Sequence, residues 1–237
     1  MQYLRLAKKL GLLALVVAML SLSTPTWTQA QETLADETAD PAAPVTPIAP
    51  VIPVAQPSVE VNGRGQQVSK KFTLQAGLLT YHATHSGSSN FVVYILDGAT
   101  GAEVTSIVNE IGKVDATKAM QLKKGGTYAV QVQADGPWSL TFEQPRPTEA
   151  PAGPQAYNGA GTSLSPFFQT GGGLVVIGGL YQGDGRVAIR VRDANGVVVE
   201  QIANQVGTFS GSKGVSLTPG IYFLELYGNG TWSVNVE

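Results

Sequence analysis

The sequence predicts an all-β protein made of two tandem antiparallel β-sandwiches of the jelly-roll or immunoglobulin-like kind. Three observations carry this prediction: apolar and polar residues alternate with a period of two, turn-forming residues recur at short intervals, and the whole pattern occurs twice. Alternation with period two places one face of a strand on a core and the other in water. The 237 residues include 28 glycines and only 14% charged residues, a composition typical of short strands joined by tight turns.

The first 30 residues have the features of a secretory signal peptide. Arg5, Lys8 and Lys9 precede the apolar run 10–22, and the segment ends in Thr-Gln-Ala, a partial match to a small-x-small cleavage site. Because the run is shorter than the ~20 residues that span a bilayer, we expect cleavage and no membrane span afterwards, with an uncleaved anchor as the alternative. The protein is therefore expected to be secreted, periplasmic or attached to the cell envelope. The lack of cysteine fits a bacterial exported protein better than a small secreted eukaryotic domain.

Residues 31–58 are first acidic and then rich in proline. Five prolines recur at every third position: Pro41, Pro44, Pro47, Pro50 and Pro53. Polyproline II helix has three residues per turn, so the spacing predicts an extended spacer. A docking ligand for an aromatic groove is the alternative.

Charge and cysteine content exclude several function classes. The chain has 15 basic and 17 acidic residues, and four of the acids lie at 32–40, so residues 41–237 are nearly neutral. A nucleic-acid partner that needs a basic field is excluded, as are a disulfide scaffold, a thiol nucleophile and a Cys-ligated zinc site. We expect no cofactor and no metal.

An internal duplication follows the spacer. Residues of one segment recur 94 to 96 positions later, and the offset falls along the unit as single deletions in turns would produce. The pairs include Gly65 and Gly161, Phe72 and Phe168, Asp97 and Asp193, Ile107 and Ile202, Tyr128 and Tyr222, and Trp138 and Trp232. The predicted organisation is a signal peptide at 1–30, a spacer at 31–58, a β-sandwich at 59–145, a proline-rich linker at 146–157 and a second β-sandwich at 158–237, with about seven strands in each copy.

Two strand patterns give finer expectations. In the segment 187–192, Arg190 and Arg192 alternate with apolar residues, so both belong on a wet face, where Glu200 or Glu225 is expected to pair with them across strands. The segment 91–96 is apolar throughout, as in a strand that is covered on both faces. The sequence leaves open whether the two copies pack together.

Both copies share one layout: an aromatic edge strand, a Gly-led apolar strand, a strand that ends in Asp before a Gly turn, and a Gly-x-Tyr strand. The residues are Phe72, Gly77, Asp97, Gly101, Gly126 and Tyr128, and in the second copy Phe168, Gly173, Asp193, Gly196, Gly220 and Tyr222. This layout resembles the bacterial pre-peptidase C-terminal (PPC-type) β-sandwich, an accessory domain of secreted enzymes and envelope proteins, over most of 63–237. The family commonly carries an acid at the head of its central strand. Asn90 and Arg186 stand there instead, which puts any implied cation site in doubt.

Four residues are candidates for ligand binding: Trp138, Trp232, Asn90 and Arg186. A tryptophan can stack on a sugar ring, but Trp138 shares the parity of Leu140 and Trp232 that of Val234, which favours core positions. Asn90 and Arg186 begin equivalent strands in the two copies.

No catalytic set is evident. His82 and His85 are three residues apart on a predicted strand and so point to opposite faces, which favours surface or edge histidines over a zinc or nickel site. No Gly-x-Ser-x-Gly elbow occurs, and the acids lie mostly at turns. We therefore expect no enzymatic activity.

The sequence favours an exported, non-catalytic tandem β-sandwich protein with a structural or protein-interaction role at the bacterial cell envelope. Its partner would be an envelope protein. A carbohydrate-binding accessory module, whose partner is a polysaccharide, is the alternative, and a hydrolase is the least favoured reading.

Overall fold

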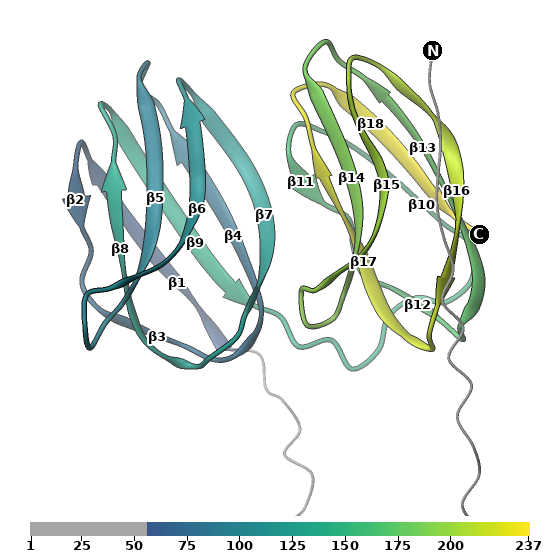
Figure 1. Cartoon of the computed structure of the whole chain (residues 1–237), viewed down its shortest axis with the longest axis horizontal. Coiled ribbons are helices and arrows are strands. Elements are labelled where there is room, and N and C mark those ends of the chain that lie inside the picture. Colours follow the sequence, from purple (N-terminus) through teal and green to yellow (C-terminus); the bar gives the residue numbers. More distant parts are fainter. Residues whose placement is uncertain (1–55) are drawn as a thin grey trace, which may run out of the picture. The chain divides into compact units, whose positions relative to one another are not determined.

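The computed structural model describes residues 56–237, which fold into two β-sandwiches (Figure 1). The predicted signal peptide and most of the predicted spacer lie outside the described residues. None of the described structure forms a helix with the length and apolar character that crossing a membrane requires.

The first repeat has nine strands in two antiparallel sheets. They are β1 (Gln56–Arg64), β2 (Gln67–Val68), β3 (Phe72–Leu74), β4 (Gly77–His85), β5 (Asn90–Asp97), β6 (Glu103–Ile111), β7 (Val114–Leu122), β8 (Gly126–Gln133) and β9 (Pro137–Gln144). One sheet has the order β1-β9-β4-β7. The other has the order β2-β8-β5-β6, and β3 also pairs with β8.

The second repeat has the same topology. Its strands are β10 (Gln155–Ala160), β11 (Ser163–Leu164), β12 (Phe168–Thr170), β13 (Gly173–Gln182), β14 (Arg186–Asp193), β15 (Val198–Val206), β16 (Phe209–Leu217), β17 (Gly220–Tyr227) and β18 (Thr231–Val236). The sheets have the orders β10-β18-β13-β16 and β11-β17-β14-β15, with β12 also paired to β17.

The all-β class and the two repeated sandwiches are confirmed. Each repeat has nine strands rather than about seven. One of the extra strands arises because a sheet edge is split into two short pieces, β2 with β3 and β11 with β12. The strand β1 begins at Gln56 and β10 at Gln155, so both start inside segments predicted as spacer and linker.

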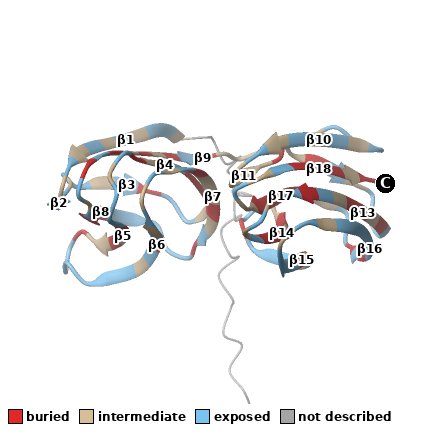
Figure 2. Ribbon diagram, turned by 90° about the horizontal axis from the view of Figure 1, so that it is seen from above, coloured by how far each residue is buried: buried red, intermediate tan, exposed pale blue. Residues whose placement is uncertain are grey.

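The core of each repeat lies between its two sheets, and Figure 2 shows buried residues along strands of both repeats. The strand β5 shows why: Phe91, Val93 and Ile95 are buried in the core of the first repeat, whereas Tyr94 and Leu96 point outward and are half-buried. The prediction that this strand is covered on both faces is therefore only partly correct: its inner face is buried, and its outer face is partly exposed.

A glycine opposite each core tryptophan makes room for the indole. Gly63 pairs with Trp138 and Gly159 with Trp232, and a Cβ on either glycine would lie 2.5 or 2.4 Å from the indole Cζ2 atom. The duplicated Gly and Trp positions are thus one packing unit, used once in each repeat.

Candidate functional site

The two tryptophans lie in the cores. Trp138 is 3% exposed and Trp232 is 7% exposed. Their Nε1–H groups donate to the backbone oxygens of Gly65 and Gly161, at 2.9 and 3.2 Å. Since core side chains cover both indoles, a sugar ring has no face to stack on, and the assignment of these two residues as ligand contacts is corrected.

Asn90 and Arg186 are both exposed at the starts of β5 and β14. The Arg186 guanidinium donates from Nε and Nη2 to Asn204 Oδ1, at 3.1 and 2.9 Å. Arg186 also lines a cavity, so of the four candidates it has the clearest access to a ligand. Asn90 lies on the outer part of the first repeat, opposite Ile111 in the neighbouring strand.

The two histidines point to opposite sides of β4, as the strand parity predicts. The exposed His82 donates from Nε2 to Asp115 Oδ1 at 2.8 Å. The prediction that both are surface or edge residues is wrong for His85, which is buried and stacks on Phe91 with ring centroids 4.6 Å apart. Among residues 56–237, no group of three or more His, Cys, Asp or Glu side chains could hold a metal ion.

His85 links three loops at one end of the first repeat. Its Nδ1–H donates to the Gly112 oxygen at 2.7 Å. Its Nε2 lies 3.2 Å from Asp135 Oδ1, a close contact without the alignment of a hydrogen bond. The other Asp135 oxygen accepts the N–H groups of Ser88 and Ser89, at 3.0 and 3.1 Å. These N–H groups lower the pKa of the Asp135 carboxyl, with the Ser88 backbone bond contributing most.

The second repeat makes the equivalent connection between loops with a tyrosine and an asparagine, and Asn229 Nδ2 donates to Asp184 Oδ1 at 3.0 Å. Tyr181 stands at the position of His85, and its hydroxyl donates to Asn229 Oδ1 at 2.7 Å. The hydroxyl also accepts the N–H groups of Asn229 and Gly230. His85 and Asp135 therefore connect neighbouring loops of the first repeat, as Tyr181 and Asn229 do in the second.

The two repeats are joined through the outer strand β7 of the first repeat. The Thr117 N–H donates to the Thr162 oxygen at 2.9 Å. The Ala119 N–H donates to Glu225 Oε1 at 3.1 Å. An outer strand presents unpaired backbone groups that would otherwise invite pairing with another chain, and the second repeat occupies these two.

An apolar cluster lies beside these bonds. Leu78, Ala119 and Phe223 are buried together, with Leu164 and Phe167 packed against them. The rings of Phe167 and Phe223 meet edge to face, with centroids 5.3 Å apart. We call Leu78, Thr117 and Ala119 the docking edge of the first repeat. The receiving face of the second repeat comprises Leu164, Phe167, Phe223 and Glu225.

Glu225 connects this contact to two arginines. Its Oε2 accepts from Arg192 Nε and Nη2, at 3.0 and 2.8 Å, and lies 3.3 Å from Arg190 Nη1. Pairing of both arginines with Glu225 confirms one of the two predicted partners, whereas Glu200 pairs with Lys213 at 3.0 Å. The expected wet face is wrong for Arg192 and Glu225, which are buried because the first repeat packs over this side of the sheet.

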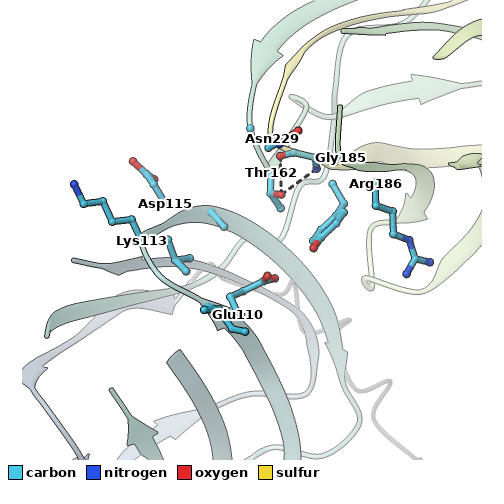
Figure 3. A pocket seen from close by; sticks show the side chains of 13 residues that line it. Glu110, Lys113, Asp115, Thr162, Gly185, Arg186 and Asn229 are labelled. Atoms are coloured by element: carbon cyan, nitrogen blue, oxygen red, sulfur yellow. Dashed lines mark hydrogen bonds between the residues drawn. The ribbon is translucent and has the colours of Figure 1, made fainter. Parts of the chain in front are cut away.

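A groove runs alongside the contact, with two cavities of about 440 and 300 Å³. Figure 3 shows the larger one, with side chains from both repeats around it: Glu110, Lys113, Asp115, Thr162, Gly185, Arg186 and Asn229. In the smaller one, Lys118 Nζ lies 2.9 Å from Glu110 Oε1 and 5.4 Å from the centre of the Tyr227 ring. Arginine and lysine side chains, the three carboxylates of Glu110, Asp115 and Glu225, and one aromatic ring thus line a single groove.

No family model matches the chain, and no curated protein matches it. Among solved structures, the exported protein XepA of PBSX matches at 10% identity and a TM-score of 0.27, covering 81% of this chain and 88% of that one. A fucolectin from striped bass (Morone saxatilis) serum matches at 11% identity and a TM-score of 0.23, covering 75% and 84%. The N-terminal CBM22-1–CBM22-2 tandem domain of Xyn10C from Paenibacillus barcinonensis matches at 10% identity and a TM-score of 0.23, also covering 75% and 84%. Matches at this level assign no family, and the resemblance to the PPC-type domain stays a prediction.

Proposed function

We propose that this chain is an exported, non-catalytic protein that makes protein–protein contacts at the bacterial cell envelope. One observation carries the proposal. Leu174 occupies in the second repeat the position that Leu78 occupies in the docking edge of the first, and it is 75% exposed whereas Leu78 is fully buried. An apolar side chain at a position already used for packing is a natural contact for a further protein surface.

The strand beside Leu174 adds to this surface. β16 is the outer strand of its sheet, and Ser212 and Gly214, which correspond to Thr117 and Ala119, are exposed. An outer strand with small side chains leaves its backbone groups accessible to a partner. The exported location rests on the basic and then apolar start of the sequence.

The experiment is covalent cross-linking in intact cells that produce the wild-type chain or its Leu174→Glu variant. We expect an envelope partner that cross-links to the wild type and is lost in the variant, while both chains reach the same cell fraction. Leu180→Glu is the matched control, because Leu180 is an exposed leucine farther along the same face of β13. Equal cross-linking of all three chains would reject the proposal, and N-terminal sequencing of the recovered protein tests cleavage after Ala30.

The groove favours a second candidate, the binding of an acidic polysaccharide. Arg186, Arg190 and Lys118 line one cavity together with Glu225 and the Tyr227 ring. Arg190 already pairs with Glu225, so Arg186 is the guanidinium that could hold a carboxylate in two parallel hydrogen bonds. Retention on acidic but not neutral polysaccharides, weakened by Arg186→Ala, would support this role. Arg64→Ala, which removes the same charge from the exposed strand β1, is the control.

A further inference from the structure

The duplication gives each repeat a copy of both surfaces that join the repeats. The counterpart of the docking edge lies on the second repeat, where Leu174, Ser212 and Gly214 replace Leu78, Thr117 and Ala119. We call these three residues the free edge. The counterpart of the receiving face lies on the first repeat, where Val68, Lys71, Ala129 and Gln131 replace Leu164, Phe167, Phe223 and Glu225. We call these four residues the counterpart face.

The free edge keeps the chemistry of the docking edge. In both repeats a leucine follows the glycine that starts β4 or β13, and the outer strand β7 or β16 runs beside it. Leu78 pairs with Gln121 and Leu174 with Ser216. The docking edge adds two backbone N–H donors, from Thr117 and Ala119. On β16 the same two positions are exposed.

The counterpart face keeps an apolar character and an acceptor. Val68 corresponds to Leu164 of the second repeat. Leu164 packs against the cluster that contains Leu78, whereas Val68 is 62% exposed. On the other side of β8 from β2, the outward residues of β5 are Val92, Tyr94 and Leu96, and the last two are only half-buried. Such a strand has the sequence of one covered on both faces, although this chain covers the outer face only in part: Val92 is buried, and Tyr94 and Leu96 are half-buried.

Gln131 is the first repeat's counterpart of Glu225, whose carboxylate accepts the Ala119 N–H. The Gln131 Oε1 atom can therefore accept a backbone N–H from an approaching outer strand. Lys71 and Ala129 replace two phenylalanines, so the apolar contact on this face is smaller than on the receiving face.

We propose that the free edge of one chain docks on the counterpart face of a second copy of this chain, repeating head to tail the contact that joins the two repeats. This inference rests on the proposed function and names its partner. The two surfaces differ, so a pair of docked chains still has one unused free edge and one unused counterpart face at its two ends. Such a contact can therefore add further chains in a row. The smaller apolar contact makes it weaker than the contact within the chain.

Sedimentation velocity of the full-length purified chain, from about 1 µM to about 1 mM, tests the proposal. We expect the mean mass of the wild type to rise with concentration. Leu174→Glu breaks the free edge and Val68→Glu breaks the counterpart face, and each should weaken self-association more than about tenfold. Both side chains are highly exposed, so the fold should be retained, and Leu180→Glu is the control that should associate like the wild type.

Mixing the two variants gives the sharpest outcome. The Leu174→Glu chain retains its counterpart face and the Val68→Glu chain retains its free edge, so one contact can form between them. The mixture should contain a species with the mass of one chain of each, and neither variant should dimerise alone.

A wild type that remains monomeric throughout overturns the inference, as does self-association that Val68→Glu leaves intact. The second result would indicate edge-to-edge pairing through β16 instead. If the chain is monomeric but Leu174→Glu still removes an envelope cross-link, the proposed function stands and only the identity of the partner is wrong. Failure of both experiments rejects both proposals.

Discussion

The backbone N–H of Ala119 in the first repeat donates a 3.1 Å hydrogen bond to the carboxylate of Glu225 in the second. The same carboxylate holds Arg192 with two bonds, so one buried side chain satisfies an outer strand and a guanidinium together. Removal of either repeat would leave charged or backbone groups without these partners. Specific hydrogen bonds and a buried carboxylate therefore stabilise the contact between the repeats, in addition to the linker that connects them.

Replacing Glu225 by glutamine should destabilise the chain markedly. The new amide oxygen would keep an acceptor for Ala119 but leave the buried Arg192 without its counter-charge, and breaking one partner of a buried pair costs about 3 kcal/mol or more. Urea unfolding followed by tryptophan fluorescence, to which the buried Trp138 and Trp232 both contribute, measures the loss. The control is Glu200→Gln, which removes a carboxylate from the more exposed pair with Lys213 and should change the free energy of unfolding by less than about 1 kcal/mol.

Gly196→Ala should separate the repeats, whereas Gly101→Ala should not. Both glycines occupy equivalent turns with positive φ, +84° and +74°, so alanine adds about 1 kcal/mol of backbone strain at either site. At Gly196 the new Cβ would also lie 2.6 Å from the Met120 oxygen in the other repeat, while at Gly101 nothing lies within 4 Å. Faster proteolysis of the linker in Gly196→Ala alone would show separation, and equal rates in the two variants would contradict it.

Much of the fold was predictable because each signal is local. Period-two alternation identified the core faces, including both tryptophans. The parity of Arg190 gave Glu200 and Glu225 as candidate cross-strand partners, of which Glu225 is the one that pairs. The buried position of His85 was also readable, since it shares the parity of Leu79, Tyr81 and Ala83 on its strand, all of which are in the core.

The contact between the repeats was not predictable, although it left a trace. Leu78 and Phe223 are outward-pointing residues in strands whose apolar runs break the alternation, and single outward apolar residues are common on any protein surface. Only the tertiary arrangement shows that they meet. The burial of Arg192 followed from the same contact, so its environment could not be read from its own strand.

Acid should destabilise the wild type more than Asp135→Asn. The Ser88 and Ser89 N–H groups hold the pKa of Asp135 below its usual value, so its ionised form stabilises the fold above about pH 4. This contribution is lost as the pH falls through the lowered folded-state pKa, and the urea midpoints of the two chains should converge there. Part of the acid slope should remain in the variant, because hydrogen bonds also lower the pKa values of Asp97, Asp184 and Glu200. Parallel curves for the two chains would contradict this role of Asp135.

Lys71→Phe should strengthen head-to-tail association. Lys71 corresponds to Phe167 of the receiving face, which packs against Phe223 and the cluster that contains Leu78 of the docking edge. Phenylalanine at position 71 would therefore restore an apolar contact for Leu174 of the next chain. Burial of one aromatic ring is worth about 1.5 kcal/mol or more, which corresponds to about tenfold tighter association in sedimentation.

Lys70→Phe is the control, because it adds the same ring at the neighbouring position, whose counterpart Pro166 lies outside the cluster. The gain should vanish when Leu174→Glu is added, because the new phenylalanine is expected to contact Leu174 of the free edge. Nonspecific apolar association through the phenylalanine would not depend on Leu174. If Lys70→Phe gains as much, the added ring acts nonspecifically and head-to-tail docking loses its support.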